Sequence, residues 1–275
     1  MRLLPLAGTV VVAVAALAGG YLWFAGRQFA DRIGDLRSAM VAEQSAASAA
    51  APDLPPIVRD FALRAGGREG QARVFHAQQT ATLATARGAS PIAVTADQWT
   101  GMVAPGIVWA ANGTMNALPV AVFDAFVGGR GELSARILGA IQVTGGDGPE
   151  YDKGELMRYL SELPVYPDAI LNNASLAWRQ IDDRTVEVTG RSATGPAAVR
   201  FIFDEAGDIV RMESDDRPMG IDGGKTVPTR WHGLYGKYTQ FGSYRIPSYG
   251  EVGWVLADGL FTYWHGTIVT YEVVE

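Results

Sequence analysis

The feature that most constrains this chain is an alternation of apolar and polar residues that recurs in short segments from residue 75 to the C-terminus. Residues 133–143 alternate in this way, whereas residues 120–127 are apolar on nearly both faces. The first such segment has four apolar positions separated by polar ones, Phe75, Ala77, Ala81 and Leu83. A period of two is typical of a strand with one buried face, and a continuous apolar run is typical of a strand covered on both faces. The alternation therefore predicts a chain built mostly from strands.

Turn residues between these segments predict antiparallel pairing. Asp182 and Asp183 separate the runs LAWRQI and RTVEVT, and Gly207 lies between AVRFIF and IVRMES. Near the C-terminus, Asp258-Gly259 separates two further alternating runs. Short acidic or glycine-containing reversals between alternating runs are typical of hairpins. The chain lacks the regular succession of strands and helices that a parallel, doubly wound sheet requires.

Helical patterns are few after residue 54. Residues 57–65 carry one apolar face and end at Gly66-Gly67, and residues 152–163 begin at a capping-like Asp152 and Glu155 and stop at Pro164. A short helix is also expected at 167–172. We therefore predict the α+β class: a mostly antiparallel, curved, half-barrel-like sheet with two or three helices, preceded by one N-terminal transmembrane helix.

The N-terminal segment from Leu3 to Ala25 contains no charged residue. As a helix it would extend about 34 Å, which exceeds a hydrocarbon core of about 30 Å. We predict a transmembrane anchor or signal segment at 1–26, an Ala/Ser-rich stalk or linker at 27–53 and a single β-rich domain at 54–275. We predict that residues 3–25 attach the chain to a membrane.

Two alternatives stay open for the N-terminal segment. Ala16-Leu17-Ala18 before Gly19 matches a signal-peptidase site, so cleavage after Ala18 competes with retention. One arginine, Arg2, precedes the segment and three arginines follow it. Because the more positively charged flank of a membrane segment usually stays in the cytoplasm, this count alone favours a cytoplasmic domain. A short basic start before an apolar run is nevertheless typical of exported proteins. We predict a single-pass protein of the cell membrane with its domain in the periplasm or outside the cell.

Composition and spacing argue against several kinds of chemistry. The net charge is −6 and no basic cluster is present, so we expect no nucleic-acid partner. The chain has no cysteine, and its three histidines, His76, His232 and His265, lack the close spacing of a zinc site. No serine has the glycine pattern of a nucleophile elbow. We therefore predict no metal, no cofactor and no catalytic residue.

Aromatic side chains on a sheet with few helices instead predict an apolar cavity, because so few helices cannot cover both faces of a curved sheet. Two polar groups could face this cavity. Arg158 and Glu162 share one helix with Glu155 at ion-pair spacing, and Arg245 and Glu251 flank Pro247. The candidate ligand-binding residues are Trp178, Phe201, Phe203, Trp231, Trp254, Tyr263, Arg158, Glu162, Arg245 and Glu251.

Three hypotheses of function follow. The first is a membrane-anchored, non-catalytic binder of an apolar or lipid-like ligand. The second is a cell-envelope hydrolase that uses Glu155, Glu162 or His265 as acid or base, which requires these groups to converge in a cleft. The third is a scaffold for protein partners, which requires an exposed sheet edge or apolar patch.

Several motifs resemble a family of uncharacterised bacterial proteins known only as a domain of unknown function. They are GPEYDKGELMRYLSELPVYP, LAWRQIDDRTVEVT, FIFDEAGDIVRMES, RIPSYGEVGW and FTYWHGTI, within residues 54–274. This resemblance implies no established activity and no catalytic residue. In architecture the chain is also similar to the periplasmic lipoprotein carrier and receptor group, whose half-barrel surrounds an apolar cavity closed by helices. It departs from the receptors because it has no cysteine for lipidation.

Overall fold

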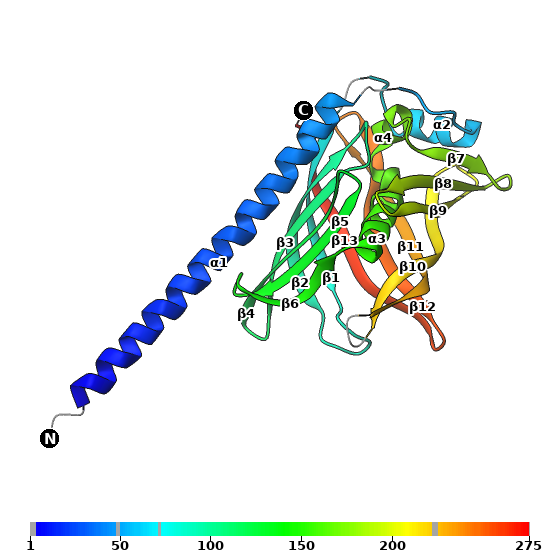
Figure 1. Cartoon of the computed structure of the whole chain (residues 1–275). Coiled ribbons are helices and arrows are strands. Elements are labelled where there is room, and N and C mark those ends of the chain that lie inside the picture. The colour runs from blue at the N-terminus through cyan, green and yellow to red at the C-terminus, as the bar shows by residue number, and fades with distance from the viewer. Residues whose placement is uncertain (1–3, 48–49, 71–72, 222–224, 275) are drawn as a thin grey trace.

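The structure, a computed structural model, describes residues 4–47, 50–70, 73–221 and 225–274 (Figure 1). Its helices are α1 (Leu4–Ala46), α2 (Pro56–Arg64), α3 (Pro149–Ser161) and α4 (Pro167–Asn172), with a 3-10 turn η1 (Leu163–Val165). Its strands are β1 (Val74–Leu83), β2 (Ile92–Gly101), β3 (Ile107–Met115), β4 (Leu118–Val127), β5 (Arg130–Ile137), β6 (Ile141–Asp147), β7 (Ala177–Gln180), β8 (Thr185–Ser192), β9 (Gly195–Phe203), β10 (Ile209–Ile221), β11 (Lys225–Phe241), β12 (Tyr244–Leu256) and β13 (Gly259–Val273).

The strands form one curved sheet from two meanders. Its order is β6-β5-β4-β3-β2-β1-β13-β12-β11-β10-β9-β8-β7, and the first and last strands pair antiparallel at its middle. The segment α3-η1-α4 connects the edge strands β6 and β7 (Figure 1). The predicted α+β class with a mostly antiparallel curved sheet is confirmed, and the three helices expected after residue 54 correspond to α2, α3 and α4.

Helix α1 covers part of the outer face of this sheet. Its buried stripe recurs at spacings of four and seven residues, as one face of a helix does, and comprises Ala25, Phe29, Leu36, Met40 and Gln44. Phe29, Leu36 and Met40 pack with Val108 and Phe123. Residues 27–46, expected to be part of a stalk, are thus a continuous helix that contacts the domain. The division of the chain into three parts stays a prediction.

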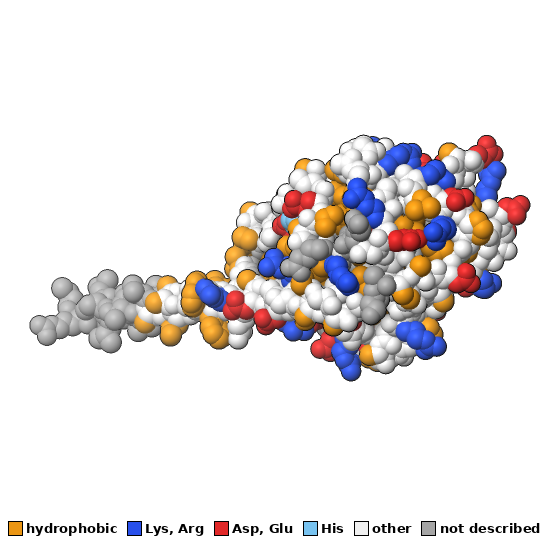
Figure 2. Space-filling view, turned by 90° about the horizontal axis from the view of Figure 1, so that it is seen from above, with side chains coloured by type: hydrophobic (Ala, Val, Ile, Leu, Met, Phe, Trp, Pro, Cys, Tyr) orange, Lys and Arg blue, Asp and Glu red, His pale blue; other side chains and the backbone are white. Residues whose placement is uncertain are grey.

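Residues 13–24 of α1 project from the domain (Figure 2), and Leu17, Tyr21 and Trp23 are exposed. Over the described residues, no helix is both long enough and apolar enough to cross a membrane. This finding contradicts the predicted single-pass location, and Leu3, where the predicted span begins, lies outside those residues. The apolar run gives way at Arg27 to a helix segment that packs on the chain's own sheet. The structure likewise gives no support to the predicted periplasmic or extracellular placement of the domain.

The inner face of the sheet has two ends that are filled differently. At the closed end, α2 and α4 cover a dense core in which Phe61 of α2 packs edge-on against Phe203 at 6.1 Å. The core there also contains Phe75, Phe126, Tyr166, Phe201 and Ile246. At the open end, the same strands carry Leu83, Ile92, Val94, Met115, Val122 and Trp264. Helix α3 lies between the two ends (Figure 1).

Candidate functional site

A cavity of about 770 Å³ lies between α3 and the open end of the sheet. Ligand sites in proteins commonly have volumes of about 300–1,000 Å³ and mostly apolar walls. The six open-end residues named above all line this cavity, and the facing wall adds Trp231, Val252 and Trp254. The cavity therefore has the size and surface of a site for an apolar molecule.

Helix α3 brings charged side chains to this cavity. It packs against β4, β5 and β6 of one meander and against β8, β9 and β10 of the other. Glu155, Arg158 and Glu162 follow one another at spacings of three and four residues, so they share one helix face. All three line the cavity.

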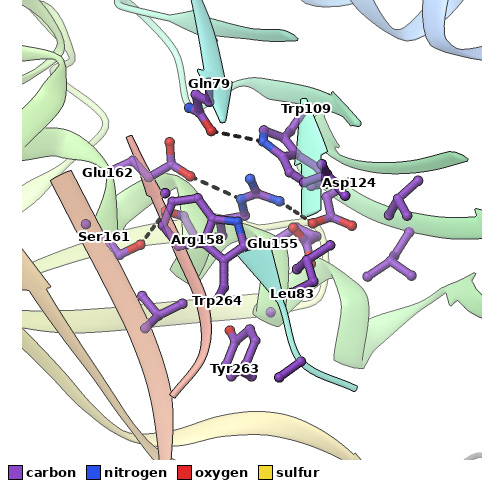
Figure 3. Close-up of a pocket in the computed structure, with 18 of the residues that line it drawn as sticks. Gln79, Leu83, Trp109, Asp124, Glu155, Arg158, Ser161, Glu162, Tyr263 and Trp264 are labelled. Atoms are coloured by element: carbon purple, nitrogen blue, oxygen red, sulfur yellow. Dashed lines mark hydrogen bonds and ion pairs between the residues drawn. The ribbon is translucent and has the colours of Figure 1, made fainter. Parts of the chain in front are cut away.

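Arg158 is the centre of a buried ion-pair group (Figure 3). Its Nε donates to Glu162 Oε1 at 3.1 Å, and a terminal nitrogen donates to Asp124 on β4. Its guanidinium also lies 4.9 Å from the ring centre of Trp109. Burial by itself would lower the pKa of Arg158, but Asp124 and Glu162 raise it above its ordinary value. Arg158 therefore stays charged and is neutralised from two sides.

Neutral polar groups continue this network along the sheet. Trp109 Nε1 donates to Gln79 Oε1 at 3.1 Å, and Gln79 Nε2 donates to Gln98 Oε1 at 3.2 Å. Gln98 in turn donates to Tyr166 Oη at 2.8 Å and to Glu162. Buried polar groups without partners cost free energy, so these bonds fix the rotamers around the ion-pair group.

Glu155 and Arg217 form a second, looser pair. A terminal nitrogen of Arg217 lies 3.9 Å from Glu155 Oε1, which is beyond hydrogen-bonding distance. Burial, reinforced by the nearby charge of Asp124, raises the pKa of Glu155 to about 8. Among the described residues, Glu155 Oε2 is buried and has no hydrogen-bond partner. At neutral pH Glu155 is thus mostly protonated, and Arg217 has no carboxylate in direct contact within the described chain.

The structure brings together five of the ten residues predicted to bind a ligand. Arg158, Glu162, Trp231, Trp254 and Tyr263 all line the cavity. The other five lie elsewhere: Trp178, Phe201, Phe203, Arg245 and Glu251.

Three of those five belong to the closed end. Phe201 and Phe203 are buried in the main core, and Trp178 stacks on Phe201 with ring centres 6.3 Å apart. Their apolar character was recognised correctly, but α2, α3 and α4 fill the space in front of them.

Arg245 and Glu251 do not converge on the cavity. Arg245 makes two bonds of 2.8 Å to Asp208, and Glu251 accepts a bond of 2.8 Å from Tyr249 Oη. Both alternate along β12 with Ile246 and Val252, which pack with the main core, so they point to the other face.

The three groups proposed for a hydrolase do not all converge. Glu155 and Glu162 line the main cavity, whereas His265 lines a separate, shallower hollow near residues 82–91. No group of three or more histidine, cysteine or acidic side chains in the described parts of the chain could hold a metal ion. His265 is therefore separated from the two carboxylates, which share one cavity, and the hydrolase hypothesis keeps only Glu155 and Glu162 as candidate acid and base.

Two charged residues that line the cavity were not predicted from the sequence, Asp124 and Arg217. Asp124 is the one charge within the otherwise apolar run 120–127. A lone carboxylate in a strand covered on both faces requires a buried partner, and this signal was available. Arg217 lies among polar residues at 213–217, and nothing local distinguishes it.

Comparison with known proteins identifies the family. The model of a family of unknown function, DUF6544, matches residues 44–266, which confirms the family resemblance predicted from the motifs. No curated protein matches the sequence. Solved structures similar to the chain include a LolA superfamily protein from Nitrosomonas europaea, with 10% identity, a TM-score of 0.43 and coverage of 79% of this chain and 94% of the other. A DUF1329 family protein from Desulfovibrio piger has 9% identity, a TM-score of 0.38 and coverage of 80% and 94%. We draw no functional conclusion from likenesses at these TM-scores.

Proposed function

We propose that this chain, which belongs to the DUF6544 family of unknown function, is a non-catalytic protein that binds an apolar, lipid-like ligand in the cavity between α3 and the open end. The observation that carries the proposal is the cavity itself, with a volume of about 770 Å³ and aliphatic and tryptophan side chains along its walls. Apolar surface gains free energy when a ligand removes it from water.

A glycine of α3 supports the proposal that the cavity holds a ligand. Gly154 occupies the interior of α3, where glycine costs about 1 kcal/mol relative to alanine. It lines the cavity, and a Cβ at this position would meet no atom within 4 Å. The glycine is therefore not required by close packing of the chain itself. A larger side chain here would extend into the cavity.

The charged groups support binding without catalysis. Arg158, Asp124 and Glu162 are paired with one another, and Glu162 also accepts a bond from Gln98. Groups committed to mutual pairing are suited to holding a cavity's shape, whereas an acid or base must reach the reacting atoms.

A titration with 1-hexadecanol tests this proposal, because the probe is uncharged and four cavity tryptophans, Trp109, Trp231, Trp254 and Trp264, can report binding by fluorescence. We expect saturable binding to the wild-type chain and at least tenfold weaker binding to Gly154→Leu. The matched control is Gly34→Leu, which alters a helical glycine of α1 that also has open space around it. Equal binding to all three proteins would contradict the proposal.

A further inference from the structure

The two arginines of the cavity differ in how well their charges are matched. Arg158 contacts two carboxylates, on Asp124 and Glu162. Arg217 has a side chain only 11% exposed, yet its single carboxylate neighbour within ion-pair distance in the described chain is Glu155 at 3.9 Å. A buried cation without a close anion is costly. Among the described residues of the cavity, Arg217 is therefore the arginine without a carboxylate at hydrogen-bonding distance.

Aromatic side chains lie close to the guanidinium group of Arg217. Its guanidinium carbon lies 4.0 Å from the ring centre of Trp231 and 5.8 Å from that of Trp254. One terminal nitrogen is 3.4 Å from Tyr263 Oη, which also accepts a bond of 3.1 Å from Trp231 Nε1. A guanidinium carries five N–H donors, and in Arg217 the described neighbours of these donors are Tyr263 Oη at 3.4 Å and Glu155 Oε1 at 3.9 Å, both long contacts that leave donor capacity for a ligand. Such a guanidinium is suited to bidentate binding of a carboxylate.

Glu155 does not supply that carboxylate at neutral pH. Its side chain is 5% exposed, and burial followed by the charge of Asp124 raises its pKa to about 8. The protonated group can share its hydrogen with an incoming anion, which a second ionised carboxylate beside Arg217 could not do.

The charges around the cavity favour a ligand with one negative charge. Among the described residues that line the cavity, Arg158 and Arg217 stand beside Asp124, Glu150 and Glu162, so the site has no excess of positive charge even when Glu155 is protonated. Arg217 nevertheless has no carboxylate within hydrogen-bonding distance among these residues. A carboxylate adds one negative charge beside Arg217. A doubly charged phosphate would add two, next to Glu155 and the carboxylates that already surround Arg158.

We propose that Arg217 binds the carboxylate head group of a long-chain carboxylic acid whose acyl chain occupies the open end of the cavity. This inference rests on the proposed function and names its ligand class. The head group would lie beneath α3, between Arg217 and Glu155. The chain would extend along Leu83, Val94 and Trp264.

Four probes with the same 16-carbon chain test the head group: hexadecanoate, 1-hexadecanol, hexadecylamine and hexadecyl phosphate. Each is titrated at pH 7 below its micelle concentration by calorimetry. For the wild-type chain we expect hexadecanoate to bind at least tenfold more tightly than any of the other three.

Variants assign the preference to Arg217. Arg217→Gln should weaken hexadecanoate at least tenfold and change 1-hexadecanol less than twofold, and Arg217→Lys should retain part of the preference. Arg211→Gln is the control, since it lies on the same strand with a 44% exposed side chain paired to Glu213. Circular dichroism checks folding, and the wild-type comparison of probes does not depend on any variant.

The outcomes separate this inference from the proposed function. If 1-hexadecanol binds and hexadecanoate binds no more tightly, or if Arg217→Gln weakens both equally, the head-group inference is overturned while the apolar site stands. Tightest binding of the phosphate or the amine overturns it as well. If none of the four probes binds, the proposed function itself fails.

Discussion

The two ends of the inner sheet face share strands and the alternation of apolar and polar residues, but one end is densely packed and the other borders a cavity. Phe75 and Leu83 lie at the two ends of β1. Phe75 is fully buried and stacks on Tyr271 at 4.6 Å, whereas Leu83 is half-buried at the cavity wall. The closed end is crowded with aromatic rings beneath α2 and α4, whereas the open end combines tryptophans with smaller side chains, among them Val94 and Ala135.

This difference shows that side-chain size and helix placement, rather than strand pattern, decide where a cavity remains. Interiors normally pack without voids larger than a water molecule. At the closed end the rings achieve this. At the open end the alanines, valines and glycines leave about 770 Å³, and α3 borders that space with charged side chains.

The largest expected effect compares the two ends on one strand. Phe75→Ala should lower the free energy of unfolding by about 3–5 kcal/mol, because it creates a void in a dense core. Leu83→Ala should cost roughly 1–2 kcal/mol, because it enlarges an existing cavity and loses only part of its burial. Urea denaturation measures both. Equal losses would mean that the ends are packed alike.

A second prediction concerns the boundary between the ends. Folded Glu155 has a pKa of about 8 against an ordinary 4.5, so above pH 4.5 the unfolded chain releases a proton that the folded chain keeps. Stability therefore falls as pH rises towards 8, by at most about 1.4 kcal/mol per pH unit. Glu155→Gln should remove this loss and become more stable than wild type at pH 8, by at most about 4 kcal/mol.

Urea denaturation at pH 5 and pH 8 measures the difference. Glu205→Gln, at an 86% exposed side chain, serves as the control and should follow the wild type. An unchanged pH dependence in Glu155→Gln would show that Glu155 is ionised throughout.

The protonation of Glu155 also predicts how ligand binding depends on pH. Once ionised, Glu155 itself neutralises Arg217 and repels an anionic head group, so hexadecanoate should bind about tenfold more weakly at pH 9 than at pH 7. Binding of 1-hexadecanol should stay constant. The titratable and charged groups near Glu155 include Tyr151 and Arg158 of α3, Glu162 directly after this helix, Asp124 of β4, Arg217 of β10 and Tyr263 of β13.

Calorimetry with Glu155→Gln sharpens this prediction, because its hexadecanoate affinity should not change between pH 7 and pH 9. A pH effect that persists in the variant would place the titrating group elsewhere.

The smallest expected change in stability concerns Gly154 of α3. Gly154→Ala should raise the free energy of unfolding by about 1 kcal/mol, since alanine favours a helix and the added methyl group meets open space. Thermal denaturation measures the gain. A loss of stability would mean that the cavity wall is closer to α3 than described.

The sequence predicted most of the strands and three helices because those signals are local. Alternation, the turn at Asp182-Asp183 and the stop at Pro164 each depend on neighbouring residues. The placement of α1 was not predicted. Phe29, Leu36 and Met40 have helical spacing, but they lie in a segment whose charged and alanine-rich composition is typical of an exposed stalk. Cleavage after Ala18 stays a prediction.

The candidate site was predicted only in part, because it depends on contacts between distant segments. Arg158 and Glu162 were found from their helical spacing, whereas Arg217 reaches Glu155 only through the pairing of the second meander. Arg245 and Glu251 could have been rejected from their alternation with Ile246 and Val252. Phe201 and Phe203 could not have been, since only the position of the helices separates core from cavity.

The most direct test of a ligand cavity is a crystal structure of the chain with 16-bromohexadecanoate, whose bromine can be located by anomalous scattering. We predict bromine density within the open end, near Leu83, Val94 and Trp264, and the carboxylate within hydrogen-bonding distance of Arg217. Bromine density outside the cavity, or an empty cavity at a saturating concentration, would contradict the account.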